Sequence, residues 1–287
     1  MAVNPIFSID ANSSALTTLG FLNSTSVDLA NSLARLSSGL RIVSPADDPG
    51  GLAQSITLSA QASRATAAST VITNATSFSN SQNSFLTQVQ SSLTQLSDLA
   101  VSAQSGTATP ADISTYTTEF VQLQNFISDV GNKQFNGINL FGGQGLSVIT
   151  GGDSSNTFNL TPIDLANASP SVGLASAYDT SAVTIGTAAA AASAQSVIAT
   201  AIQTVGMMIA NVGSNVERLN LTNDSQTSLA TNLTNASNAI TKVDLPTEIA
   251  NFSQLSLLQQ TQNEALAQEL LLPQLSLNLL TSLPKLG

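Results

Sequence analysis

Hydrophobic residues recur at alternating intervals of four and three along most of this chain. The most regular run comprises Ile198, Ile202, Val205, Ile209, Val212, Val216 and Leu219. This spacing places the side chains on one face of a helix. It predicts a long helix that begins after Thr187 and whose apolar pattern weakens toward Ile240.

A second long helix is predicted between Ala46 and about Gln104. Proline is absent from this stretch after Pro49, and glycine is absent after Gly51. At 1.5 Å per residue the helix is roughly 80 Å long. Its second half carries a similar stripe, formed by Phe78, Phe85, Val89, Leu93, Leu96, Ala100 and Ala103. The turn SGTATPAD then precedes a shorter helix with an apolar face of Phe120, Leu123, Ile127 and Val130, so a helical hairpin is expected.

The middle of the chain has a different pattern. Between Asn136 and Gly186, Gly, Asn and Thr are frequent, and the β-favouring runs LSVIT and TFNLT flank GGDSSN, which predicts one or two β-hairpins. A break at KVDLPTE precedes a last helix whose apolar residues are Ile249, Phe252, Leu255, Leu258, Leu266 and Leu270. The predicted fold class is mainly α, with long antiparallel helices that form coiled-coil bundles and a small β-hairpin region in the middle.

The faces opposite the apolar stripes carry Ser, Thr, Asn, Gln and Ala, whereas free coiled coils usually carry Glu and Lys there. Small polar side chains lose little rotamer entropy on burial and can hydrogen-bond across a contact. From Pro246 onward the charged residues are Glu248, Glu264, Glu269 and Lys285. Leucine is abundant in the same segment, and one helix cannot bury that much apolar surface, so a partner surface is implied.

The composition excludes several kinds of function. Seven basic residues against 17 acidic ones give a net charge of −10, which disfavours nucleic acid as a partner because phosphate binding needs clustered Lys and Arg. His and Cys are absent, which excludes Ser/His/Asp and Cys/His nucleophilic sites and zinc held by these residues. We therefore expect no enzyme, no cofactor and no metal site.

The same composition bears on targeting. The N-terminus MAVNPIFSIDANSSALTTLGF lacks the basic segment, apolar segment and cleavage site of a secretory signal peptide. No run approaches ~18 apolar residues, so no membrane insertion is expected.

The stretch LARLSSGLRIVSPADDPGG contains Arg35 and Arg41, two of the seven basic residues, and places Asp47 beside Asp48. Adjacent residues on a helix point about 100° apart, so the two carboxylates do not converge as a catalytic pair. They are expected to cap the long helix from its first turn, where negative charge is favourable. The alternative is a salt bridge to either arginine.

The GGDSSNT segment is predicted to be an exposed loop. It is either a plain loop or an acceptor of O-linked sugar on Ser154, Ser155 or Thr157.

Both ends of the chain resemble the bacterial flagellins. NSSALTTLGFLNSTSVDLANSLARLSSGLRI is similar to the first helix of that family and its ERLSSGLRIN signature. LTQLSDLAVSAQSGT and KQFNGINLF resemble the outer-core helices and the entry to the β-hairpin. TEIANFSQLSLLQQTQNEALAQELLLPQLSLNLL follows the C-terminal pattern. About Gly142 to Gln195 has no counterpart.

The resemblance implies a division into three parts. Residues 1–44 and 246–287 pair as inner-core helices of a tubular filament, residues 45–135 and 186–245 form an outer-core helical bundle, and residues 136–185 form the β-hairpin region with a small outer knob. The implied filament contacts are Leu33, Leu36, Leu40, Phe252, Leu255, Leu258, Leu266 and Leu270. The connector between the two tubes holds Arg35, Arg41, Asp47 and Asp48 as partly buried ion pairs.

The function implied by the resemblance is that of a structural subunit, which polymerises into the extracellular flagellar filament for motility and whose terminal helices fold on assembly. The protein would reach the filament by export in an unfolded state through the flagellar type III apparatus, without a cleaved signal peptide. Its partners would be copies of itself, an export chaperone and the cap and hook-associated proteins. Pro49 stands where flagellins more often have Ala, so a hook–filament junction protein is an alternative. A secreted adhesin or immune-receptor ligand is another.

The resemblance also implies a patch read by the flagellin-sensing Toll-like receptor. The matching positions are Gln95, Leu99, Ser102 and Glu119. Typical agonists carry Arg where this chain has Gln95, and Gln where it has Ser102. An arginine replaced by glutamine loses charge-assisted hydrogen bonds, so weak receptor activation is predicted.

Overall fold

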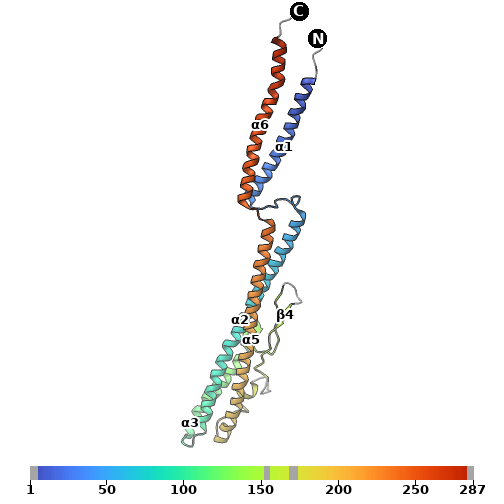
Figure 1. Cartoon of the computed structure of the whole chain (residues 1–287). Helices are drawn as coiled ribbons and strands as arrows, with labels where there is room; N and C mark the ends of the chain where they lie inside the picture. The colour runs from blue at the N-terminus through green and yellow to red at the C-terminus, as the bar shows by residue number, and fades with distance from the viewer. Residues whose placement is uncertain (1–5, 152–155, 168–173, 283–287) are drawn as a thin grey trace, which may run out of the picture. The chain divides into compact units, whose positions relative to one another are not determined.

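The structure is a computed structural model that describes residues 6–151, 156–167 and 174–282 (Figure 1). Its helices are α1 (Ile6–Ser38), α2 (Pro49–Ala103), α3 (Pro110–Gly131), α4 (Ala175–Tyr178), α5 (Ala188–Thr241) and α6 (Leu245–Ser282). Its strands are β1 (Gln134–Phe135), β2 (Ile138–Asn139), β3 (Ser147–Ile149) and β4 (Thr157–Asn159). The predicted fold class is confirmed: long helices dominate, and the short strands lie in the middle of the chain.

The chain forms two compact units. The terminal unit comprises Met1–Ser59 and Thr234–Gly287, and the central unit comprises Ala60–Leu233. Two helices, α2 and α5, contribute residues to both units. The sequence analysis divided the chain between residues 44 and 45 and between residues 245 and 246, near the breaks between helices rather than within α2 and α5. That division stays a prediction.

The central unit is built around one hydrophobic core. Every second member of the α5 stripe is completely buried: Ile198, Val205, Val212 and Leu219. The intervening Ile202, Ile209 and Val216 are partly buried against the same core. Within this unit α2 and α5 run antiparallel, because Gln104 Nε2 donates to Gln195 Oε1 (2.9 Å) and Ser69 Oγ donates to Asn223 Oδ1 (2.5 Å).

Two antiparallel β-hairpins follow α3. The first turns at Asn136 and Gly137, whose φ angles of 50° and 79° are typical of the Asn-Gly turn that joins two strands. In the second, Val148 pairs with Phe158 and both are buried, which confirms the hairpin predicted from LSVIT and TFNLT. The ring of Phe158 lies 4.1 Å beneath the Arg218 guanidinium of α5. The short helix α4 was not predicted, because four residues are too few for a periodic pattern.

The helix ends follow local signals. A capping box starts α3: Thr109 and Asp112 exchange hydrogen bonds, and Pro110 occupies the first turn. The Thr109 hydroxyl and N–H lower the pKa of Asp112. The break predicted at KVDLPTE is confirmed between Thr241 and Leu245.

One helix bears on the expectation that the chain does not insert into a membrane. In the part of the chain that the structure describes, α5 is long and apolar enough, by length and composition alone, to cross a membrane. Its alanine-rich start raises the overall apolarity without a continuous run of large side chains. The stripe residues of α5 lie in the central core, and core helices of this kind meet the same criterion. The absence of membrane insertion stays a prediction.

Candidate assembly interface

The helices α1 and α6 pair with each other in the terminal unit (Figure 1). Hydrogen bonds join their described residues: Ser32 Oγ donates to Glu248 Oε1 (2.5 Å), Gln259 Nε2 donates to Ser26 Oγ (3.1 Å), and Ser14 Oγ donates to Glu269 Oε1 (2.9 Å). Residues with higher numbers on α1 pair with residues that have lower numbers on α6. The pair is therefore antiparallel.

The line along which the two helices meet, here called the seam, contains both polar and apolar residues along its length. Its residues are partly or fully buried and follow heptad spacing in both helices. On α1 they are Ala15, Thr18, Leu22, Thr25, Leu29, Ser32 and Leu36. On α6 they are Glu248, Phe252, Leu255, Gln259, Gln262, Leu266 and Glu269. Apolar contacts therefore alternate with small or polar ones.

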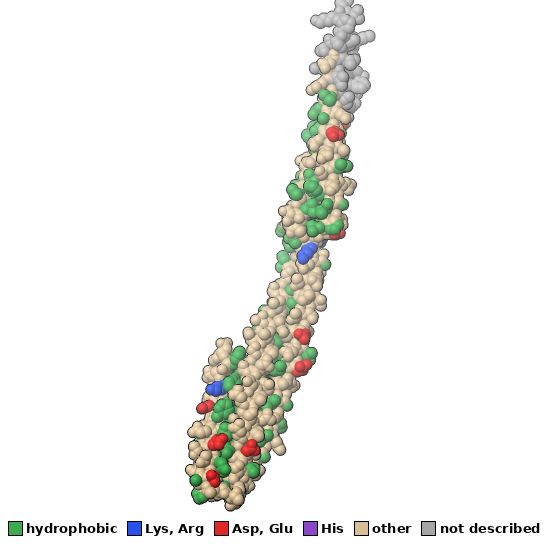
Figure 2. All heavy atoms as spheres, turned by 90° about the vertical axis from the view of Figure 1, so that its left-hand side faces the viewer, with side chains coloured by type: hydrophobic (Ala, Val, Ile, Leu, Met, Phe, Trp, Pro, Cys, Tyr) green, Lys and Arg blue, Asp and Glu red, His purple; other side chains and the backbone are tan. Residues whose placement is uncertain are grey.

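Large apolar side chains lie on the outside of the same pair. On α1, Leu16 and Phe21 are 62% and 60% exposed, and on α6 Leu257 is 65% exposed. Figure 2 shows hydrophobic side chains along one face of this pair. Others that are exposed are Leu19, Val27, Leu33, Leu245, Ile249, Leu258, Leu270 and Leu271. The exposed apolar residues of α6 lie around the helix rather than forming one stripe. A helix that is apolar all round is normally buried on all sides.

The eight predicted filament contacts fall into two groups. Half of them, Leu36, Phe252, Leu255 and Leu266, are partly buried and belong to the seam. The other half, Leu33, Leu40, Leu258 and Leu270, are exposed. The exposed Leu16, Phe21 and Leu257 were not predicted as contacts, because they lie off the apolar stripe. The polar residues of the seam were not predicted either, because the prediction used apolar residues alone.

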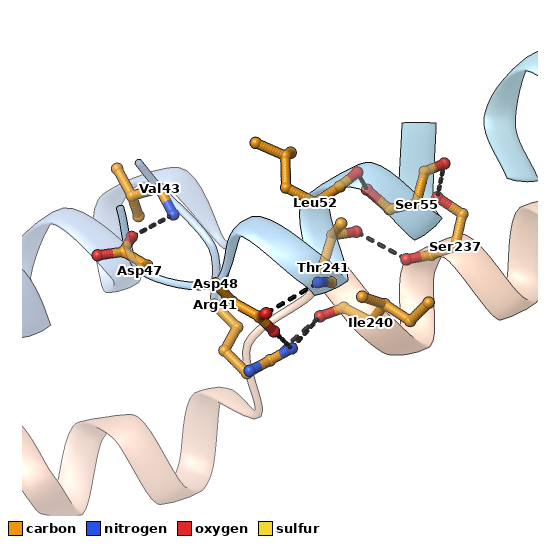
Figure 3. Close-up of polar contacts among 10 residues, drawn as sticks. Arg41, Val43, Asp47, Asp48, Leu52, Ser55, Ser237, Ile240 and Thr241 are labelled. Carbon is orange, nitrogen blue, oxygen red and sulfur yellow. Dashed lines mark hydrogen bonds and ion pairs between the residues drawn. The ribbon is translucent and has the colours of Figure 1, made fainter. Parts of the chain in front are cut away.

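The connector between α1 and α2 is fastened to the end of α5 (Figure 3). Arg41 N–H donates to the Thr241 carbonyl (2.7 Å), and Nε and Nη2 of its guanidinium donate to the Ile240 carbonyl (3.1 and 2.8 Å). Nη2 also lies 3.3 Å from Asp48 Oδ2 in an ion pair. One arginine therefore joins the connector to the end of α5, two segments that are about 200 residues apart in sequence.

The capping role predicted for the two aspartates is found at Asp48, which also forms the alternative salt bridge to Arg41, and not at Asp47. Helix α2 begins at Pro49 rather than near Ala46, so neither carboxylate lies within its first turn. Asp48 Oδ1 accepts the Gly51 N–H (2.8 Å) and caps the helix start. Asp47 Oδ2 accepts the N–H groups of Val43 (2.9 Å) and Ser44 (2.8 Å) and folds the connector. The proline at position 49 fixes the helix start, since proline is favoured at the first helical position.

The ion pair is also more exposed than expected. Arg41 and Asp48 have exposed side-chain fractions of 49% and 37% in the single chain, so the partly buried setting implied by the resemblance is not found within it. No ion pair of Arg35 is found among the described residues, and its charge is the smallest of the effects that lower the pKa of Asp47. In both aspartates the pKa is below its usual value, for Asp47 chiefly through the Ser44 N–H and for Asp48 chiefly through the Gly51 N–H.

Acid is expected to loosen the connector. The pKa of Asp47 in the folded state is lower than the usual 3.8. At pH values between the folded and the unfolded pKa, the unfolded chain therefore binds more protons than the folded one. The stabilisation is thus complete above pH ~4 and is lost as the pH falls through the lowered native pKa. Relative to the intrinsic exchange rate at each pH, amide hydrogen exchange of Val43 and Ser44 should accelerate over this range. In Asp47→Asn, which keeps an oxygen acceptor but does not titrate, the acceleration should be much smaller; equal pH profiles would contradict the assignment.

Glycine at position 51 is expected to be required for the cap. A Cβ there would overlap the Asp48 carboxylate, whereas one at Gly50 would lie 3.7 Å from Asp48 Oδ1 in ordinary contact. Ala normally favours a helix over Gly by about 1 kcal/mol, so Gly50→Ala should leave the helix start intact or strengthen it. Gly51→Ala should instead displace Asp48 and speed amide exchange in the first turn of α2 about fivefold or more. Equal exchange in both variants would refute the cap.

The remaining predicted residues lie in the central unit. Gln95 and Ser102 are exposed on α2, Leu99 is half-buried there, and Glu119 is exposed on α3. Thr157 is exposed but belongs to strand β4 rather than to a loop. Ser154 and Ser155 lie outside the described residues. The receptor patch and the sugar acceptors stay predictions.

A helix pair with a seam of mixed polarity and an apolar outer surface is typical of a structural protein that assembles through that surface. Comparison with known proteins identifies the family. The bacterial flagellin N-terminal helical region matches residues 9–145, and the bacterial flagellin C-terminal helical region matches residues 195–280. The chain belongs to the bacterial flagellin family. The unmatched residues between these regions coincide closely with the segment for which the sequence analysis found no counterpart.

Individual relatives are similar over parts of the chain. Flagellin of Escherichia coli (strain K12) is 31% identical over 160 residues, which cover 54% of this chain and 32% of that protein. Phase 2 flagellin of Salmonella abortus-equi is 31% identical over 185 residues, covering 62% and 36%. The chain thus spans about a third of the length of these relatives. A crystal structure of Bacillus cereus flagellin has a TM-score of 0.46 and 27% identity, covering 57% of this chain and 93% of that one.

Proposed function

We propose that this protein is a structural subunit that polymerises with copies of itself into the extracellular filament of the bacterial flagellum and so serves motility. Contacts between unlike surfaces of neighbouring copies build an open filament rather than a closed ring. The proposal is supported by membership of the flagellin family. That family is one of structural proteins, which accords with the expectation that the chain is not an enzyme.

The observation that carries the proposal is the exposed apolar surface of the α1–α6 pair. Leu16, Phe21 and Leu257 are each exposed by more than half. Soluble monomers rarely expose large contiguous apolar surface unless a partner covers it. Among the described residues of the terminal unit, α6 pairs with α1 and its outward apolar side chains stay exposed, so neighbouring copies are proposed as the covering partners.

Assembly is expected to be coupled to folding of the terminal helices. A single pair with a seam of mixed polarity buries little apolar area, whereas ordering its backbone costs about 1–2 kcal/mol per residue. The free energy of assembly therefore comes largely from apolar burial between copies. Circular dichroism should show more helix in filaments than in monomers. Equal helix content in both states would contradict the coupling.

Electron microscopy tests the function directly. The full chain, with a precipitant such as ammonium sulfate that strengthens burial, should form long uniform filaments. A chain lacking residues 1–44 and 247–287 should form none, although its central unit keeps its own core. Monomers or short rings from the full chain would overturn the proposal and favour the hook–filament junction protein instead.

A secreted adhesin that binds through its middle segment is the alternative from another class. Deleting residues 142–195 is not a clean test, because that segment supplies Val148, Leu165 and Ile185 to the central core. Changes at exposed positions are better suited, such as Ile149→Glu on β3, where the side chain is 42% exposed. Loss of surface adhesion with filaments intact would support the adhesin; neither alternative is favoured by the family matches.

The export chaperone, the cap and hook-associated proteins and export without a cleaved signal peptide belong to the same proposal. For the Toll-like receptor, weak activation is predicted because Gln95 is exposed but uncharged. Hydrogen bonds to charged groups contribute about 1.5–3 kcal/mol, so Gln95→Arg should raise potency roughly 10- to 100-fold in a reporter-cell assay. Thr94→Arg, on an adjacent exposed position, serves as the control. Full receptor activation by the parent protein at nanomolar concentration would contradict this prediction.

A further inference from the structure

Two short stretches of the terminal unit pair with each other where α1 ends and shortly before α6 begins. They are residues 39–41 and 241–243, here called the clip, and they meet as an isolated antiparallel bridge. The Arg41 N–H donates to a carbonyl of the opposite stretch (2.7 Å), and the Val243 N–H donates back to a carbonyl of the first (3.1 Å). The clip therefore joins the two segments from which α1 and α6 extend.

Further contacts hold the clip closed. The guanidinium of Arg41 donates twice to the Ile240 carbonyl (3.1 and 2.8 Å) and lies 3.3 Å from Asp48. Gly39 has a φ of 70°, which residues with a side chain rarely adopt, and Ile42 is only 5% exposed. Backbone, charge and apolar contacts therefore act together at one point of the terminal unit.

The clip lies between two sets of long-range contacts in the terminal unit. On one side, Ser237 Oγ donates to the Ser55 carbonyl (3.2 Å) and joins α5 to α2. On the other side, Ser32 and Glu248 join α1 to α6. Without the clip about 34 residues of chain separate these two contacts, and once the clip has closed only about 12 remain to be ordered. Because loop-closure entropy rises with loop length, the clip lowers the cost of the first contact between α1 and α6.

The hydrogen bonds between α1 and α6 are less shielded from water with increasing distance from the clip. Ser32 is 1% exposed and Glu248 is 8% exposed, so the hydrogen bond nearest the clip is buried. The hydrogen bond between Ser14 and Glu269 is exposed, and reaching it from the clip orders about 50 residues. Pairing that starts at the clip thus gains its best-shielded contact first and with the least ordering of the chain.

We propose that the clip is the point at which α1 and α6 begin to pair, and that pairing proceeds from it outward toward Ser14 and Glu269. Arg41 is the main residue of this starting point, because its guanidinium and its N–H both hold the clip closed. Under the proposed function this step accompanies the addition of a subunit to the filament, so its effect on filament growth rests on that function. The order in which the contacts form does not.

Pulsed hydrogen exchange during filament growth measures the order of the contacts. Monomers are added to short filament seeds in ammonium sulfate, labelled with a brief deuterium pulse at successive times, and analysed by mass spectrometry of their peptides. Peptides that contain residues 39–43 and 241–245 should become protected first, and those around Ser32 and Glu248 next. Peptides around Ser14 should become protected last. Simultaneous protection of all these peptides, or protection that begins at the outer end, would overturn the proposal.

Variants separate a starting contact from a late one by their effect on rates. A change at the starting point slows growth, whereas a change at a late contact mainly speeds the loss of subunits. Arg41→Met should therefore slow filament growth at least about fivefold and alter subunit loss less. Leu266→Ala, in the outer half of the seam, should show the opposite pattern. Light scattering after seeding and after dilution measures the two rates.

The matched control is the same change at the other arginine of this region. Arg35 lies in the last turn of α1, and no ion pair of it is found among the described residues. Arg35→Met should therefore keep both rates within about twofold of the parent. If Arg41→Met does not assemble, Arg41→Lys takes its place, because lysine keeps the charge but loses the forked donation to Ile240. Normal growth of the Arg41 variant with faster subunit loss would overturn the proposal, as would equal slowing by Arg35→Met.

Failure of the proposed function gives a different result. If the parent forms no filaments, that function is refuted and the clip is judged from hydrogen exchange in the monomer. Protection that falls from residues 39–43 toward Ser14 would then leave the assignment of the clip standing. Terminal helices without such a gradient would overturn the assignment as well.

Discussion

Replacing Phe21 and Leu257 with glutamate is expected to abolish filament formation at concentrations where the parent assembles. Both side chains are at least 60% exposed in the single chain and are expected to be buried between copies. Full burial of each is worth about 1.5–3 kcal/mol, and burying a new charge adds a further penalty. Together these effects should raise the critical concentration for assembly at least about 100-fold, as measured by sedimentation and electron microscopy.

The matched control for this prediction keeps the outer surface apolar. Phe21→Leu with Leu257→Met changes shape but little hydrophobicity, and volume-conserving exchanges of this kind usually cost under about 1.5 kcal/mol. The control should therefore assemble at close to the parent concentration. Thermal unfolding of the central unit should be the same in all three proteins, since neither position belongs to it. Filaments of the glutamate variant at the parent concentration would show that this surface is not the assembly interface.

Replacing Phe120 with alanine is expected to lower the free energy of unfolding of the central unit by about 3–5 kcal/mol. Phe120 is 1% exposed and packs in the core formed with α2 and α5, so its loss leaves a cavity that the surrounding helices fill only in part. Urea unfolding followed by tyrosine fluorescence measures this change. The chain has two tyrosines and no tryptophan, and both tyrosines, Tyr116 and Tyr178, lie in the central unit.

The control is another phenylalanine on the same helix. Phe126 is 38% exposed, so Phe126→Ala removes a similar side chain from a partly solvated position and should cost no more than about half as much. The difference between the two variants isolates burial from helix propensity, which is the same for both changes. Similar urea-unfolding midpoints for the Phe120→Ala variant and the parent would mean that this core does not stabilise the central unit.

Much of the secondary structure could be predicted because its signals are local. The three-four spacing from Ile198 to Leu219 needs no tertiary information, and neither do the break before Leu245 or the Asn136-Gly137 turn. The start of α2 was predicted near Ala46 rather than at Pro49, because it depends on where the backbone first closes a helical hydrogen bond. A proline and two glycines after Asp48 leave that point undecided in the sequence.

The candidate site was predicted less completely. The amino-acid sequence by itself determined that the terminal helices are too apolar and too poor in charge to remain uncovered, because that follows from composition. It could not determine which face of α6 meets α1, because leucines surround this helix and no single stripe stands out. Only the tertiary structure decided this: polar side chains such as Glu248 and Gln259 must find hydrogen-bond partners once they are buried, so they turn toward the serines of α1 and leave Leu257 outside.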